Sequence, residues 1–225
     1  MATVTALIFS ILAVAEASLE LHELALNPRL SPYQDPSKFI RNSANVYLLR
    51  ASAPKNTSRD RTQTFCVRSR YWSNTTEEVE RSVDVYNRTD HSIYNSMNIS
   101  LTVRNAFNTT LLHVHPNDER FSVKNGKTAN ASDAFDHEFI VLFSDANCLI
   151  LTEALLIENA IRRSLRCFMW LQKHRITKPP KCCQFVFEIL CAYQVDVVEF
   201  FDKSCLNATA PSPSSGERAT TSTVY

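Results

Sequence analysis

The stretch from Cys148 to Cys205 contains the segments R-C-F-M-W (166–170), K-P-P-K-C-C-Q-F-V-F-E-I-L-C-A-Y (178–193) and F-F-D-K-S-C-L-N (200–207). Six of the seven cysteines lie within it, and only Cys66 lies upstream. Cysteines at this density indicate a disulfide framework rather than an active site. We therefore expect a C-terminal region that is held together by disulfides, with one disulfide that connects it to Cys66.

The chain begins with an apolar run, M-A-T-V-T-A-L-I-F-S-I-L-A-V-A-E-A, which ends in small residues at Ala13, Ala15 and Ala17. This pattern predicts a secretory signal peptide over residues 1–17 and an extracellular protein. The alternative is a membrane anchor, but the run is shorter than the roughly 20 apolar residues that a spanning helix needs.

Glycosylation sequons support secretion. The acceptor asparagines are Asn56, Asn74, Asn87, Asn98, Asn108, Asn130 and Asn207. One such triplet occurs easily by chance, whereas seven behind a signal sequence indicate the secretory route. We expect most of these asparagines to face water.

Residues 18–206 are long enough for one domain with a core, and residues 207–225 form a Ser/Thr/Pro-rich tail that we expect to be disordered. The net charge is +1, which gives no strong field for nucleic acid or an anionic membrane. We expect a monomer without a cofactor.

The pattern of apolar residues predicts mostly short strands. We expect irregular chain over 18–33, a short helix over 35–43, strands over 46–49, 65–72, 79–86, 97–103, 111–115, 121–124, 139–143, 149–151, 165–171 and 197–201, and an amphipathic helix whose apolar positions are Cys182, Cys183, Phe185, Val186, Ile189, Leu190 and Tyr193. Many short strands with little helix are typical of an all-β sandwich or up-and-down barrel. Residues 97–104 alternate most clearly, with odd positions apolar, so Met97 and Ile99 should face the interior and Asn105 should follow them inward.

These parts occur in a recognisable order. The helix that opens near Asp35 is followed by N-V-Y-L-L (45–49), F-C-V (65–67), S-D-A-N-C (144–148), a C-x-x-W strand (167–170), and L-C-A-Y (190–193) on the later helix. Over roughly residues 36–206 this order resembles the tick salivary lipocalins of the histamine-binding protein family. The resemblance implies an eight-stranded antiparallel barrel, closed at one end, with the C-terminal helix packed on its outside.

The resemblance also implies three disulfides, Cys66–Cys205, Cys148–Cys183 and Cys167–Cys191. Cys182 is then left over. An odd thiol in a secreted protein is either buried or available to another chain, and we expect it to be buried because small free cysteines behave as core residues.

Relatives that bind histamine hold its cation with carboxylates inside the barrel. Carried over by the resemblance, those positions hold Asn42, Thr57, Asn105, Phe139 and Phe168, none of which is acidic. Burying an ammonium group without a counter-charge costs several kcal/mol, more than the roughly 2 kcal/mol that aromatic contacts return. This change favours an apolar ligand such as a fatty acid or eicosanoid.

The predicted ligand-binding residues are Trp170, Phe168, Phe139, His137 and Val123, with Asn105 as a polar residue in the lining of the cavity. Arg81 should face the same side of its strand as Val79, Val83 and Val85, so it could point inward and meet a ligand carboxylate. The alternative, which we favour, is a solvated side chain, because isolated arginines are seldom buried. The whole aromatic interior is alternatively a filled core without a cavity.

Other chemistry finds little support. His113 and His115 share one strand face, but no third metal ligand is evident, and we expect no metal site. Asp133, Asp136 and Glu138 around His137 fit an acidic loop that leads into a strand. The sequence lacks G-x-S-x-G, P-loop and H-E-x-x-H motifs, so we expect no enzymatic activity.

Two functions of different classes follow. The first is a secreted lipocalin that sequesters a small host mediator, a biogenic amine by family or a lipid by cavity composition, and so suppresses inflammation. The second is an inhibitor that binds a host defence protein such as complement through outer loops. Glycans at seven sites would cover much of the surface and count against a broad protein interface.

Overall fold

The computed structural model describes residues 28–53, 64–106, 109–117, 136–153, 166–192 and 195–208. The predicted signal peptide, the strand over 121–124 and nearly all of the predicted tail lie outside these ranges. Within them, no helix is long and apolar enough to cross a bilayer.

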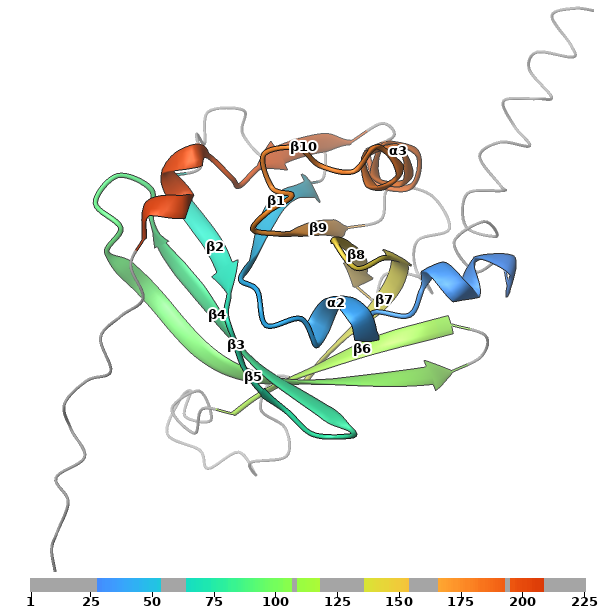
Figure 1. Cartoon of the computed structure of the whole chain (residues 1–225). Coiled ribbons are helices and arrows are strands. Elements are labelled where there is room, and N and C mark those ends of the chain that lie inside the picture. The colour runs from blue at the N-terminus through green and yellow to red at the C-terminus, as the bar shows by residue number, and fades with distance from the viewer. Residues whose placement is uncertain are drawn as a thin grey trace, which may run out of the picture.

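Ten strands and four short helical segments make up the described fold (Figure 1). The helical segments are η1 (Pro28–Tyr33), α2 (Ser37–Ile40), α3 (Lys181–Leu190) and η5 (Lys203–Asn207). The strands are β1 (Val46–Ala53), β2 (Phe65–Ser69), β3 (Tyr71–Asn74), β4 (Glu78–Asn87), β5 (Ile93–Ala106), β6 (Thr109–Pro116), β7 (His137–Ser144), β8 (Cys148–Glu153), β9 (Cys167–Gln172) and β10 (Asp196–Glu199).

Eight of these strands close into an antiparallel barrel. They follow one another in the order β1-β2-β4-β5-β6-β7-β8-β9, and β9 pairs back onto β1 with Leu48 opposite Trp170. β10 extends the sheet beside β1, and β3 pairs with β4. The barrel predicted from the family resemblance is confirmed.

Within the described residues, the strand predictions hold except at the ends of strands and over residues 65–72. Residues 65–72 form two strands rather than one, because the chain breaks at Arg70 between β2 and β3. β5 is longer than predicted, since it pairs with β4 on one side and β6 on the other over 14 residues. The irregular chain predicted before Tyr33 contains the helical turn η1.

Side chains of alternate parity form two separate cores. One lies inside the barrel and contains Phe39, Ile40, Val46, Val79, Ile99, Leu101, Leu112, Val141, Leu149 and Leu151. The other lies between the outer face of the barrel and the C-terminal segment, and it includes Tyr47, Met169, Leu171 and Phe187. The predicted inward parity of β5 is confirmed, because Ile99 and Leu101 are buried while Asn98 is exposed.

Three disulfides hold the outer core together, with the pairing that the family resemblance implies. Cys66–Cys205 ties η5 to β2, Cys148–Cys183 ties α3 to β8, and Cys167–Cys191 ties the residue after α3 to β9. The first closes a separation of 139 residues, for which the chain-entropy model gives about 4 to 5 kcal/mol of stabilisation.

The helix α3 packs on the outside of the barrel, as predicted, but with a different face. Cys183, Phe187 and Leu190 are buried at helical spacing, whereas Cys182 is exposed and Phe185 is 65% exposed. The disulfide of Cys183 fixes the buried face, and each further residue turns 100° around the helix axis. The expectation of a buried Cys182 is therefore wrong.

At one end of the barrel, α2 lies across the ring of strands (Figure 1). Asp35 starts this helix by accepting a 2.9 Å hydrogen bond from the backbone N–H of Ser37. Phe39 and Ile40 then insert into the interior core with 2% and 3% exposure. This end of the barrel is closed by apolar side chains.

Candidate functional site

The aromatic residues predicted to line the barrel lie together inside it. The rings of Phe139 on β7 and Phe168 on β9 are perpendicular with centroids 5.9 Å apart, and His137 lies 6.2 Å from Phe139. Trp170 packs against the same interior core as Phe139. Four of the predicted ligand-binding residues thus share the inner surface.

The inner face of β9 is more accessible than its outer face. Phe168 and Trp170 are only partly buried, while Met169 and Leu171 on the opposite face are fully buried beneath the C-terminal segment. A tightly filled barrel would bury the inward rings at least as well. Their partial exposure leaves part of each ring accessible at the inner surface of the barrel.

This aromatic group lies toward the end of the barrel opposite α2. The end of β9 at Gln172 adjoins the α2 side, because the N–H of Lys173 donates to the carbonyl oxygen of Asn45 at 2.9 Å. β9 therefore begins, near Phe168, at the opposite rim. β7 and β8 are antiparallel there, so His137 and Glu153 also lie at that rim.

The other predicted polar positions contribute less. Asn105 is exposed near the end of β5, opposite Thr110, and Val123 and Thr57 lie outside the described residues. Asn42 uses its side-chain oxygen to accept a 2.9 Å hydrogen bond from the N–H of Ala44. None of the described positions carried over from the family is acidic.

An acidic residue that the sequence analysis missed lies at the same rim. Glu153 is directly opposite Phe139 in the β7–β8 ladder, so its side chain leaves the same face of the sheet. Arg166 pairs with it at 3.4 Å, with side-chain exposures of 53% for Arg166 and 32% for Glu153. The alternation of Leu149, Leu151 and Glu153 could have predicted this position, since residues two apart face the same side.

Arg81 has a role that neither prediction anticipated. Its side chain is 2% exposed, and its five N–H groups all donate: Nε to Ser69 Oγ, Nη1 to the carbonyls of Ile40 and Asn42, and Nη2 to those of Ala44 and Ser69. Burial lowers the pKa of Arg81 to about 10, and the neighbouring Tyr71 opposes that decrease, so the group remains protonated at neutral pH. Arg81 is therefore neither solvated nor free to bind a carboxylate, and it anchors the α2 segment to the barrel.

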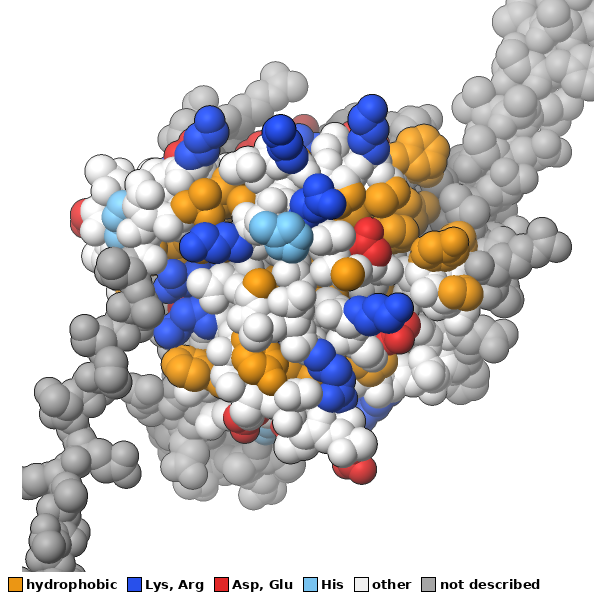
Figure 2. All heavy atoms as spheres, in the orientation of Figure 1, with side chains coloured by type: hydrophobic (Ala, Val, Ile, Leu, Met, Phe, Trp, Pro, Cys, Tyr) orange, Lys and Arg blue, Asp and Glu red, His pale blue; other side chains and the backbone are white. Residues whose placement is uncertain are grey.

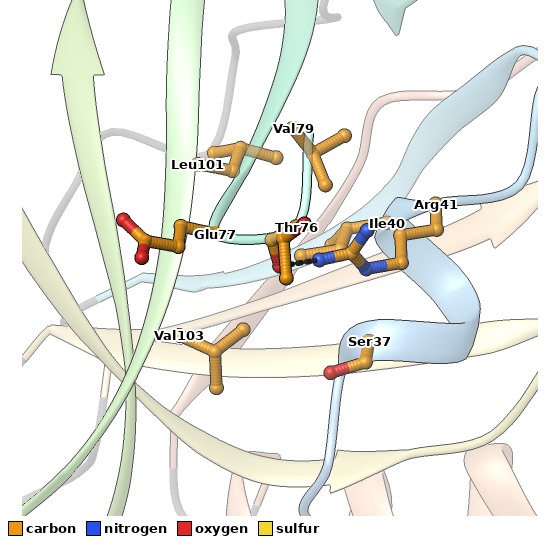
Figure 3. A pocket seen from close by; sticks show the side chains of 8 residues that line it. All are labelled: Ser37, Ile40, Arg41, Thr76, Glu77, Val79, Leu101 and Val103. Carbon is orange, nitrogen blue, oxygen red and sulfur yellow. Dashed lines mark hydrogen bonds between the residues drawn. The ribbon is translucent and has the colours of Figure 1, made fainter. Parts of the chain in front are cut away.

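A pocket of about 270 Å³ lies at the α2 end (Figure 3). It is lined by Ser37, Ile40, Arg41, Thr76, Glu77, Val79, Leu101 and Val103. The guanidinium of Arg41 points toward the turn before β4 and donates to the carbonyl oxygens of Thr75 and Thr76 at 2.8 and 2.7 Å. This pocket is small, and its one cation already holds the turn in place.

A second group of charges is buried on the outside of the barrel. Asp84 is fully buried and accepts hydrogen bonds from Arg70, Arg68 and Ser96. Burial by itself would raise the pKa of Asp84, but the hydrogen bonds from Arg70 and Ser96 and the two positive charges lower it below its usual value. Arg68 also donates to the carbonyl oxygen of Ala208, so this cluster fastens the C-terminal segment to β2 and β4.

The two histidines considered as metal ligands are bridged by a carboxylate. Asp136 Oδ1 lies 2.5 Å from His115 Nδ1, and its Oδ2 lies 3.3 Å from His113 Nε2. The hydrogen bond with His115 holds the pKa of Asp136 below its usual range. Elsewhere in the described chain, Asp145, Cys182 and Cys183 bring three donor atoms within 4.8 Å of one another. Cys183 is in a disulfide there, so it offers no thiolate for a metal.

Three of the seven predicted acceptor asparagines, Asn74, Asn98 and Asn207, are exposed. Asn87 is half-buried, and its amide nitrogen donates to the hydroxyl of Tyr94 at 2.8 Å. The remaining three, at positions 56, 108 and 130, lie outside the described residues.

The chain is similar to two solved structures and to one protein family. No curated protein matches the sequence. Among solved structures, Japanin from Rhipicephalus appendiculatus, bound to cholesterol, is 19% identical, with 73% of this chain and 96% of Japanin covered at a TM-score of 0.46. AM182 in complex with serotonin is 13% identical, with 75% of this chain and 90% of AM182 covered at a TM-score of 0.45.

The family comparison covers most of the chain. The model of the tick histamine-binding protein family matches residues 24–207, which include every described strand and all three disulfides. The chain belongs to the tick histamine-binding protein family.

Proposed function

We propose that this protein is a secreted lipocalin that sequesters a small apolar or lipid mediator of the host inside its barrel and thereby suppresses inflammation. The observation that carries the proposal is the group of partly exposed rings, Phe139, Phe168 and Trp170, on the inner surface. Ligand pockets are mostly apolar and aromatic, with a few placed polar groups. His137 is the polar residue that we assign to the site, whereas Asn105 is exposed near the end of β5.

The charges at the rim favour a ligand with a carboxylate over an amine. Glu153 is the inward-facing acid there, and Arg166 already compensates its charge. An ammonium ligand would have to displace Arg166 to gain a counter-ion. A fatty acid or eicosanoid would instead place its chain against Phe139 and Phe168 and its carboxylate near Arg166.

We further assign residues 1–17 to a cleaved signal peptide and residues 18–206 to the secreted domain. The exposed acceptor asparagines at 74, 98 and 207 support passage through the secretory route. Three disulfides support an oxidising compartment in the same way.

Tryptophan fluorescence tests the proposal, because the chain has two tryptophans in different places. Trp170 lies inside the barrel, whereas Trp72 is 52% exposed with Arg70 stacked over its ring. Protein secreted from insect cells is titrated with a panel of fatty acids and leukotrienes. We expect a ligand-dependent change that Trp170→Phe abolishes and Trp72→Phe retains.

A change that survives Trp170→Phe would place the ligand elsewhere, and no response to the whole panel would refute lipid binding in the barrel. Calorimetric titration with histamine is the matched measurement for an amine. We expect no binding tighter than roughly micromolar, because the cavity lacks an uncompensated acid among its described residues. Nanomolar histamine binding would overturn the preference for a lipid.

A further inference from the structure

A continuous basic segment lies outside the barrel, in the connection between β9 and α3. Residues 173–181 read K-H-R-I-T-K-P-P-K, with four Lys or Arg residues, one His and no acid. The side chains of Lys173, Arg175, Lys178 and Lys181 are exposed. Ile176, 2% exposed, anchors the turn to the outer core, so the cations project from a fixed backbone.

These cations are not neutralised by neighbouring side chains. In the described part of the chain, none of the ion pairs involves Lys173, Arg175, Lys178 or Lys181. Asp145, which lies close to Cys182 in the first turn of α3, already accepts hydrogen bonds from the backbone N–H groups of Asn147 and Cys148. The positive charge of the segment is therefore available to a partner.

The surface continues onto α2. The N–H of Lys173 donates to the carbonyl oxygen of Asn45, which follows α2, and Lys38 of that helix is exposed as well. Figure 2 shows Lys and Arg side chains spread over the face that holds α2 and α3, with few acidic side chains among them. We call Lys38, Lys173, His174, Arg175, Lys178 and Lys181 the basic face.

We propose that the basic face binds a sulfated glycosaminoglycan. The net charge of the chain is only +1, so the concentration of cations on one face makes the molecule electrically asymmetric. The cations lie along hydrogen-bonded turns that lead into Pro179 and Pro180, so a fixed backbone presents several positive charges together to the sulfates of a polysaccharide chain. Lysine- and arginine-rich segments of this length are typical of heparin-binding patches.

The chemistry of the segment argues against two other polyanions. A membrane-binding surface adds apolar side chains that enter the lipid, but the isoleucine within 173–181 is buried. Single-stranded nucleic acid is held by aromatic side chains that stack on bases, and the segment contains none. A sulfated polysaccharide needs only the charges.

The test is binding of the full secreted protein to immobilised heparin at increasing NaCl concentrations. Arg175→Gln/Lys178→Gln removes two charges from the basic face. Arg104→Gln/Lys203→Gln is the matched control, because it removes one Arg and one Lys, both exposed, from other elements. We expect the wild type and the control to elute at similar salt and the basic-face variant to elute earlier, with the salt dependence of log Kd reduced by about one per removed cation.

Equal shifts in both variants would show a response to net charge and would overturn the proposal. So would wild-type protein that fails to bind heparin at physiological salt, or that binds vesicles of phosphatidylcholine and phosphatidylserine or a single-stranded oligonucleotide more tightly than heparin. Lipid titration followed by Trp170 fluorescence reports the barrel separately. We expect both double variants to keep that response, so failure at the basic face is distinguishable from failure in the barrel.

Discussion

Nη1 of Arg81 donates a 2.8 Å hydrogen bond to the carbonyl oxygen of Asn42, which joins the middle of β4 to the chain just after α2. The same nitrogen donates to the carbonyl oxygen of Ile40 at 3.0 Å. The carbonyl oxygens at the end of α2 therefore accept hydrogen bonds from a side chain rather than from the N–H groups of a following helical turn. The closed end of the barrel depends on this arginine.

We expect Arg81→Met to destabilise the protein strongly. The change leaves the carbonyls of Ile40, Asn42 and Ala44 without their donor in a buried place, which costs about 3 to 5 kcal/mol. Arg81→Lys should restore part of this, because an ammonium group has three donors rather than five. Urea unfolding measures both, and exposed Arg104→Met serves as the control with an expected change within about 0.5 kcal/mol. Equal stability of Arg81→Met and Arg104→Met would contradict the anchoring role.

Acid should weaken the attachment of the C-terminal segment through Asp84. The pKa of Asp84 is lower in the folded protein than its ordinary value of 3.8. The unfolded chain therefore binds this proton more readily, and the free energy of unfolding falls as the pH drops through 3.8 toward the folded pKa. The stabilisation is fully present at neutral pH, where Asp84 is ionised in both states.

The variant Asp84→Asn tests whether Asp84 causes this loss of stability in acid. The variant should be less stable than wild type at neutral pH by about 3 to 5 kcal/mol, since it leaves Arg68 and Arg70 beside an uncharged partner. Its stability should also vary less with pH below about 4 than that of the wild type. Denaturant unfolding at a series of acidic pH values gives both quantities, and parallel pH profiles for the two proteins would rule out Asp84 as the source.

The exposed Cys182 should react with a thiol reagent in the native protein. Its sulfur is the free thiol among the described cysteines, and the other six are in disulfides. We expect labelling of about one thiol per chain without denaturant, and none in Cys182→Ser. The serine variant should unfold within about 0.5 kcal/mol of the wild type, because an exposed side chain adds little to the core. Labelling only after unfolding would show that Cys182 is protected.

Substitution of Arg166 and of Glu153, the ion pair at the rim of the barrel, should affect ligand binding in opposite directions. Arg166→Gln should weaken fatty-acid binding by roughly threefold to tenfold, since a charge-assisted contact at a half-exposed site is modest. Glu153→Gln should leave binding unchanged or strengthen it, because Arg166 is then free for the ligand carboxylate. Displacement of a fluorescent fatty acid measures both variants. Weaker binding in Glu153→Gln and unchanged binding in Arg166→Gln would indicate a cationic ligand instead.

The sequence by itself determined the features that depend on local pattern. Alternation over residues 97–104 predicted which side of β5 faces inward, and the spacing of the cysteines with the short motifs around them indicated the family and its three disulfides. The resemblance to the family, rather than alternation, predicted that the rings of Phe139, Phe168 and Trp170 line the interior. Side-chain direction in a strand repeats every two residues, so one reliable position fixes its neighbours.

Only the tertiary structure decided how Arg81, Cys182 and Glu153 are used. Arg81 is buried because backbone carbonyls from residues about 40 positions earlier converge on it, and no local pattern encodes that convergence. Cys182 is exposed because the disulfide of its neighbour Cys183 sets the rotation of α3 on the barrel. Glu153 belongs to the rim of the site because β8 pairs with β7, opposite Phe139. In each case contacts between distant segments, rather than the residue type, determine whether a side chain is structural, reactive or part of the binding surface.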